Sequence, residues 1–197
     1  MTDVFFMVVV FLIPIAVILA SGMGTNKTNL VSTMGRRGRP GASLRAFSAY
    51  LPNSEIFGAD VDRDIIFQDE ESRIRTTYID GFNISTYNDL YDTFGSKKFD
   101  FIIDDAAHAV ASDLNTFLFA LEHVNVPGYI VIEDISFINF NSYRVIDFIC
   151  KARTNDEVVI KSHMVFTAHR RHGEKNPDPK TKSYIYVVSV QKKKQLR

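Results

Sequence analysis

Short apolar runs alternate with amphipathic segments along most of the chain. The apolar runs predict strands at Leu30–Met34, Glu55–Val61, Arg73–Ile79, Phe99–Ile103, Tyr129–Ile132, Val158–Phe166 and Tyr184–Val190. Apolar residues three and four positions apart predict helices at Ala42–Leu51, Tyr87–Phe94, Ser112–Val124 and Ser142–Ala152. Strands that alternate with helices indicate an α/β fold with a doubly wound, mostly parallel sheet. The last two strands have no helix between them, which predicts a C-terminal antiparallel hairpin at one edge.

The N-terminus breaks this pattern. Val4–Ala20 is an uncharged run of 17 residues, interrupted only by Pro14, and its length is at the lower limit for a membrane-spanning helix. We therefore expect residues 1–23 to form a hydrophobic segment that anchors the protein in a membrane, and residues 24–197 to form one domain. A cleaved signal peptide and a buried N-terminus are the alternatives. A signal peptide normally has a Lys or Arg before its apolar run, and this chain has none there.

The charges that flank this run predict its orientation. Basic residues follow the run and none precedes it; they are Lys27, Arg36, Arg37 and Arg39. Because basic residues favour the cytoplasmic side of a membrane, the domain is expected in the cytoplasm. The single cysteine, Cys150, excludes an internal disulfide and fits a reducing compartment.

The composition narrows the class of protein. A chain of 197 residues suits one compact domain. Lys plus Arg number 23 and Asp plus Glu also number 23, so the chain lacks the basic excess typical of proteins that bind nucleic acid. We therefore expect no nucleic-acid partner.

Polar residues that can carry chemistry follow the predicted strands. A glycine-rich turn from Gly35 to Gly41 follows the first strand, and the later strands are followed by Asp60, Asp80, Asp104, Asp105, His108, Glu133 and Asp134. In a sheet of this kind, ligands bind at the carboxyl ends of the strands. So many carboxylates at one edge would repel one another, which predicts a divalent cation such as Mg²⁺, Mn²⁺ or Ca²⁺ among them. Taken singly, Asp60 and Asp62 could instead cap helices, and His108 could be structural.

Two segments carry a resemblance to a known family. Phe99–His108 (FDFIIDDAAH) and Pro127–Ile135 (PGYIVIEDI) resemble class I S-adenosylmethionine-dependent methyltransferases, in the branch of macrocin-type sugar O-methyltransferases and cephalosporin-hydroxylase-like proteins. Gly41–Arg45, Ile56–Asp62 and the segment from Arg73 to Asp80 fit the same pattern. The resemblance covers about Gly24 to Ile135 and implies a Rossmann-like fold.

The resemblance also implies roles for individual residues. Gly35 and Gly41 would lie beside the methionine part of S-adenosylmethionine, Asp60 would bind the ribose, and Asp80 would lie near the adenine, with Asp104 in the same cofactor-binding set. Asp105, Glu133 and Asp134 would hold Mg²⁺ or Mn²⁺, and His108 would be the general base. The implied activity is Mg²⁺-assisted O-methylation of a small molecule or sugar that bears a hydroxyl group.

Two alternatives remain open. The family commonly has an acidic residue two positions before its first motif glycine, where this chain has Thr33, and the segment Gly24–Lys27 resembles one that normally lies upstream of the first strand. A catalytically degenerate methyltransferase fold that only binds ligands would explain this departure. A membrane-anchored glycosyltransferase could instead use Asp60-Val61-Asp62 to bind a metal and a nucleotide sugar, and its luminal domain could be glycosylated at Asn83.

Overall fold

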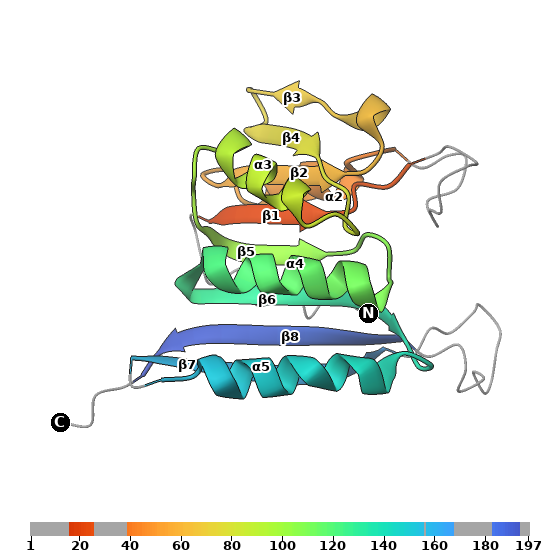
Figure 1. Ribbon diagram of the computed structural model, residues 1–197. Helices are drawn as coiled ribbons and strands as arrows, with labels where there is room; N and C mark the ends of the chain where they lie inside the picture. The colour runs from red at the N-terminus through yellow and green to blue at the C-terminus, as the bar shows by residue number, and fades with distance from the viewer. Residues whose placement is uncertain (1–15, 26–38, 156, 168–182, 194–197) are drawn as a thin grey trace.

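One eight-stranded sheet organises the molecule, in the order β3-β4-β2-β1-β5-β6-β8-β7 (Figure 1). The computed structural model describes residues 16–25, 39–155, 157–167 and 183–193. The strands are β1 (Val17–Ser21), β2 (Glu55–Asp60), β3 (Gln68–Asp69), β4 (Ile74–Tyr78), β5 (Phe99–Asp104), β6 (Val124–Ser136), β7 (Val158–Thr167) and β8 (Ser183–Lys192).

The strand directions confirm the predicted fold class. Strands β4, β2, β1, β5 and β6 are parallel to one another, and the short β3 runs antiparallel to β4. Strand β8 runs antiparallel to both β6 and β7, so the C-terminal hairpin forms one edge of the sheet. The chain therefore has a Rossmann-like α/β fold, and the carboxyl ends of its five parallel strands all point to the same side.

Helices cover both faces of the sheet. They are α2 (Ala42–Tyr50), α3 (Ser85–Thr93), α4 (Val110–His123) and α5 (Val145–Arg153), with short 3₁₀ helices η1 (Arg63–Ile65) and η2 (Phe140–Arg144). Helices α3, α4 and α5 lie in front of the sheet in Figure 1. Alternate residues of β1 enter different cores: Leu19 packs in the core that contains Phe117 of α4, and Ile18 packs in the core that contains Leu44 of α2. This alternation is why the central strands are apolar on both faces.

The first strand differs from the prediction. Val17–Ser21, which we assigned to the separate hydrophobic segment 1–23, forms β1 in the middle of the sheet, between β2 and β5. The expected membrane anchor is therefore wrong for residues 16–20, the part of the run that the structure describes; Ala16, Ile18, Leu19 and Ala20 are buried in the protein core. None of the helices in the described ranges is long and apolar enough to cross a membrane. An apolar run that is central in a parallel sheet has the same composition as a short membrane span, which explains the error.

Most other predicted elements are present with shifted ends. Strand β6 is much longer than the predicted Tyr129–Ile132, because pairing with β8 extends it to Ser136. The short β3 was not predicted, since two residues carry no periodic signal. The predicted strand Leu30–Met34 lies outside the described residues.

Candidate active site

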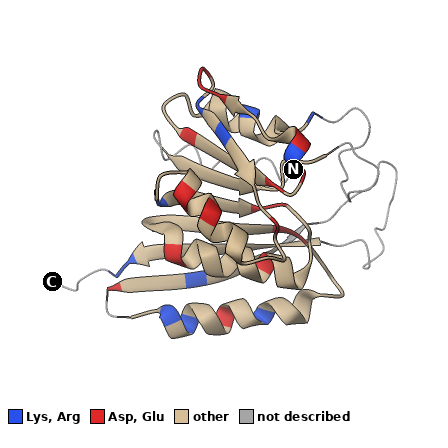
Figure 2. Cartoon of the chain, turned by 45° about the horizontal axis from the view of Figure 1, so that its top comes forward, with Lys and Arg blue, Asp and Glu red and all other residues tan. Residues whose placement is uncertain are grey.

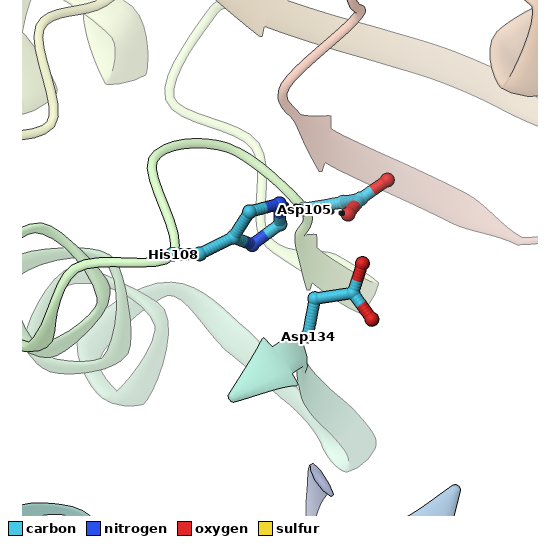
Figure 3. Close-up of side chains that lie close together, drawn as sticks. All are labelled: Asp105, His108 and Asp134. Carbon is cyan, nitrogen blue, oxygen red and sulfur yellow. Dashed lines mark ion pairs between the residues drawn. The ribbon is translucent and has the colours of Figure 1, made fainter. Parts of the chain in front are cut away.

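Three polar side chains converge where β5 and β6 end. Asp105 directly follows β5, His108 lies in the loop that leads to α4, and Asp134 comes from β6. One ligand atom of each residue lies within 4.8 Å of those of the other two. Figure 3 shows the two carboxylates facing each other with the imidazole beside them. We call these residues the triad. Figure 2 shows further acidic residues in the loops that follow the central strands.

The backbone of the triad is unusual at two of its three positions. His108 has φ 50° and Asp134 has φ 51°, in the left-handed region that residues other than glycine rarely adopt. Pairing between β6 and β8 shifts register between Ile132 and Ile135, so Asp134 lies in an irregularity of the strand. Such conformations cost on the order of 1–3 kcal/mol and persist where the surrounding structure imposes them. Here they turn two side chains toward Asp105.

The electrostatics of the triad suit a cation. Burial raises the pKa of Asp105 most, nearby His108 lowers it, and the charges of Asp134 and Asp104 raise it, which together bring it to about 6. His108 Nε2 lies 3.8 Å from Asp105 Oδ1. Two carboxylates with one imidazole are a ligand set that Mn²⁺ and Mg²⁺ accept in proteins. The residues present therefore fit the divalent ion that the sequence predicted.

The predicted ligand Glu133 is next to Asp134 on β6 but does not belong to the triad. Glu133 is not among the residues whose ligand atoms lie within 4.8 Å of one another. Its role as a metal ligand stays a prediction. His108, expected beside the metal as a base, lies close enough to both carboxylates to serve as either a base or a ligand.

A glycine turn follows β1 and was missed by the sequence analysis. Gly22 and Gly24 have φ 85° and 75°, and the turn Gly22-Met23-Gly24 takes the position at the end of the first strand that we had assigned to Gly35–Gly41. The missed signal is an apolar run that ends in Gly-x-Gly, a pattern typical of turns that approach a phosphate or a nucleoside. The run was interpreted as a membrane span, so the glycines after it were overlooked.

This glycine turn packs directly against the triad. A Cβ atom on Gly22 would lie 2.2 Å from the carbonyl oxygen of Asp105, so only glycine fits there. The Asp105 backbone N–H also donates to the carbonyl of Ser21, at 3.0 Å. The turn and the first residue of the triad are therefore in direct contact.

Two buried aspartates hold the glycine turn. Asp60 ends β2; its Oδ2 accepts from the Met23 N–H at 2.7 Å and its Oδ1 accepts from the Asp62 N–H at 2.8 Å. The Thr25 hydroxyl donates to Asp62 Oδ2 at 2.6 Å. Asp60 and Asp62 are 8% and 2% exposed. These bonds brace the turn from within, which argues against Asp60-Val61-Asp62 as an exposed metal site for a nucleotide sugar.

The other predicted cofactor residues lie at different distances from this turn. Gly41, with φ 73°, precedes α2 and donates its N–H to the Met23 carbonyl at 2.8 Å, so it borders the turn. Asp80 follows β4 and its Oδ1 accepts from the Phe82 N–H at 3.0 Å. Gly35 and Thr33 lie outside the described residues.

Asp104 is enclosed in the protein and does not belong to the triad. It is 2% exposed, and burial raises its pKa. Also buried are Asp113 of α4 and Tyr143 of η2, 1% and 0% exposed, with the Tyr143 hydroxyl donating to Asp113 Oδ2. We call Asp104, Asp113 and Tyr143 the buried cluster. A direct contact between Asp104 and a cofactor stays a prediction. Asp113 and Tyr143 were not among the predicted site residues, because no local pattern marks them.

Comparison with known proteins gives the class of this fold. No model of a known protein family matches the sequence. In structure, the chain is similar to an O-methyltransferase from Bacillus cereus solved with S-adenosylhomocysteine (SAH), with TM-score 0.62, 13% identity, and coverage of 95% of this chain and 79% of that chain. The fold is that of class I S-adenosylmethionine-dependent O-methyltransferases.

A sequence relative points to one branch of that class. The chain is 32% identical over 96 residues to mycinamicin VI 2''-O-methyltransferase of Micromonospora griseorubida, which covers 48% of this chain and 23% of the relative. It is also similar to the structure of the mycinamycin methyltransferase MycE with Mg, SAH and mycinamycin VI, with TM-score 0.59, 19% identity, and coverage of 90% of this chain. The predicted resemblance is thereby confirmed. The chain spans only 45% of the MycE chain.

Proposed function

We propose that this protein is an S-adenosylmethionine-dependent, metal-assisted O-methyltransferase that acts on a small molecule or sugar bearing a hydroxyl group. One observation carries the proposal: the glycine turn after β1 touches Asp105 of the triad, with no room for a side chain at Gly22. A cofactor on the turn and a hydroxyl at the triad would therefore be neighbours. Methyl transfer requires such proximity, because it is a displacement in line with the attacking oxygen.

The chain's own residues divide the work between two sites. The backbone of Gly22, Met23 and Gly24, braced by Asp60 and bordered by Gly41, would bind S-adenosylmethionine. Asp105 and Asp134 would hold Mg²⁺ or Mn²⁺, with Glu133 as the predicted third ligand. A bound divalent ion supplies Lewis acidity, which lowers the pKa of a hydroxyl group that it contacts.

His108 would accept the proton of the acceptor hydroxyl. An imidazole side chain can accept and release a proton near neutral pH, which suits histidine to act as a general base. Asp105 Oδ1, 3.8 Å from Nε2, would orient the ring and stabilise the imidazolium that forms. A general base in this position contributes about 10²–10⁴ in rate.

Two similar proteins support this proposal, one through the ligands in its structure and the other through the reaction in its name. The MycE structure was solved with Mg, SAH and mycinamycin VI, and the relative's name describes methylation of a hydroxyl oxygen. These facts concern those proteins, and the sequence match covers less than a quarter of the relative. They favour a hydroxyl-bearing acceptor for this chain, with a sugar as the first to test.

The proposal is tested by binding and by transfer. Calorimetric titration with SAH, with and without Mn²⁺, should show binding to the full chain. Transfer of labelled methyl from S-adenosylmethionine to a panel of glycosides and phenols should then depend on Mn²⁺ or Mg²⁺. Asp134→Asn should abolish the metal dependence, whereas Asp92→Asn, an exposed carboxylate on α3, should not change it. Absence of SAH binding would refute the proposal.

A binding module without catalysis is the second candidate, and one observation favours it. With the glycine turn at Gly22, the position two residues before the first glycine is Ala20, which is 4% exposed. The family commonly has an acid at this position, and the methyl side chain of alanine cannot accept a hydrogen bond from a ligand. SAH binding without methyl transfer to any acceptor in the panel would support this candidate.

A further inference from the structure

Two separate segments of the chain supply the triad. Residues 105–109 leave β5 and lead into α4, and they carry Asp105 and His108. The other segment follows Asp134 near the end of β6 and leads through η2 into α5. A ligand that contacts both Asp105 and Asp134 needs the two segments at a fixed spacing.

A buried hydrogen bond connects these two segments. The Tyr143 hydroxyl, in η2, donates to Asp113 Oδ2, in the first turn of α4. Tyr143 is 0% exposed and Asp113 is 1% exposed, so water does not compete for the bond. The Tyr143 ring also stacks against Tyr186 of β8, with centroids 6.5 Å apart, which fixes the ring on the sheet. The bond therefore ties the start of α4 to the segment beyond Asp134.

The conformation of the triad makes such a tie effective. His108 and Asp134 both have left-handed backbone, which local sequence alone does not favour. Tertiary contacts must therefore hold both residues in place. Asp113 lies one helical turn beyond the loop of His108, and its N–H donates to the Ala109 carbonyl at 2.9 Å, so a displacement of Asp113 is passed to that loop.

We infer that Tyr143 and Asp113 are positioning residues that set the spacing of Asp105 and His108 relative to Asp134, and through it the affinity of the triad for a divalent ion. The inference rests on the proposed function, because it assumes that the triad binds a metal. Neither residue touches the ion. Residues that hydrogen-bond directly to metal ligands change metal affinity by about 10–100-fold when they are removed, and we expect the lower end of this range for residues that act through the backbone.

The test compares two tyrosines that contact the same helix. Tyr143→Phe removes the hydroxyl that reaches Asp113. Tyr87→Phe removes a hydroxyl that lies 2.8 Å from Thr116 Oγ1, also on α4, but Tyr87 belongs to α3, which carries no residue of the triad. Both tyrosines are at most 2% exposed, so each change removes one buried phenolic hydroxyl beside α4. The measurement is calorimetric titration of the full chain with Mn²⁺ alone, together with urea denaturation.

We expect Tyr143→Phe to weaken Mn²⁺ binding by about tenfold or more, and Tyr87→Phe to leave it unchanged, while both lower the denaturation midpoint. Asp113→Asn keeps an oxygen acceptor for Tyr143 and should retain most of the affinity. Asp113→Ser, whose side chain is too short to reach, should behave like Tyr143→Phe and serves in its place if that variant does not fold.

The outcomes separate this inference from the proposed function. If the wild type does not bind Mn²⁺, the metal part of the proposed function fails, and the inference that rests on it fails as well. If the wild type binds Mn²⁺ and the Tyr143 and Asp113→Ser variants bind it as tightly, the positioning role is wrong and the proposed function stands. Equal weakening in Tyr87→Phe would also overturn the inference, because it would show a general effect of loosening α4.

Discussion

Asp104 and Asp105 are consecutive residues with opposite environments. The side chain of Asp105 is 49% exposed and lies with His108 and Asp134, whereas Asp104 is 2% exposed and lies on the side of Asp113 and Tyr143. The strand end that separates them sends one carboxylate out and the other in. The triad and the buried cluster therefore begin at neighbouring residues, but only the triad is open to ligands.

The negative charge of the acids is neutralised by a proton in the buried cluster, whereas a cation can neutralise it in the triad. In the buried cluster, burial followed by the charge of Asp104 raises the pKa of Asp113 to about 7, so a proton neutralises this acid near neutral pH. The triad is open enough for a cation to bind and to neutralise its carboxylates in place of a proton. Adjacent aspartates at one strand end therefore differ in what they can do: Asp105 is open to a ligand, whereas Asp104 is enclosed in the core.

Among changes at the triad, removal of His108 should have the largest effect on methyl transfer. We expect His108→Ala to lower methyl transfer by about 10²–10⁴-fold while Mn²⁺ affinity changes little, because the base is lost and the two carboxylates remain. Single-turnover rates and calorimetry measure the two effects separately. A parallel collapse of Mn²⁺ affinity would mean that His108 is a metal ligand.

A side chain at Gly22 should disturb the triad without contacting the buried cluster. Gly22→Ala would place a Cβ atom 2.2 Å from the Asp105 carbonyl oxygen, in a backbone conformation with φ 85°. We expect a loss of about 3 kcal/mol or more in unfolding free energy, because both the strain and the clash must be relieved. Gly95→Ala is the matched control, since Gly95 has φ 73° but nothing within 4 Å of its Cβ position. Denaturation curves that coincide for the two variants would show that the close packing is unimportant.

Divalent ions should stabilise the protein by binding to the triad and not to the buried cluster. With Mn²⁺ at about 100 times its dissociation constant, we expect about 2.7 kcal/mol of stabilisation by mass action. Asp105→Ala should abolish the increase in melting temperature, whereas Asp113→Asn should keep most of it. A wild-type melting temperature that is the same with and without millimolar Mn²⁺ would contradict the metal site.

The buried cluster should instead make stability depend on pH. The pKa of Asp113 is about 7 in the folded protein and near its ordinary 3.8 when unfolded, so between these values the folded state binds more protons. Unfolding free energy should therefore fall as pH rises from 4 to 7, by up to about 1.4 kcal/mol per pH unit from this group, and level off above 7. Asp113→Asn removes the titrating group, so its stability curve, measured by urea denaturation, should be flatter. Parallel curves for the two proteins would rule out this role.

Local pattern was sufficient for much of this molecule. The sequence predicted β5 from an apolar run and α4 from apolar residues three and four positions apart. It also predicted acids directly after the apolar runs, and Asp105 and Asp134 are two of them. Strand β1 was not recognised, because a central parallel strand and a short membrane span have the same composition. Its glycine turn was lost with it.

Tertiary contacts decide the rest. Tyr143 and Asp113 are 30 positions apart, and neither has a local feature that marks it as the partner of the other. The left-handed conformations of His108 and Asp134 are likewise imposed by packing, since neither residue is glycine. The sequence predicted polar side chains at the carboxyl ends of the strands, where the triad lies, but not the buried contacts that support the triad.

The contact between Gly22 and Asp105 has a thermodynamic consequence. The Ser21–Asp105 hydrogen bond and the close packing at Gly22 join the glycine turn and the triad, so a ligand that orders one of them also orders the other. Linkage then requires reciprocity: whatever factor Mn²⁺ adds to the affinity for SAH, SAH must add to the affinity for Mn²⁺. The two sites would load as a pair, and free cofactor would set how much metal the protein retains.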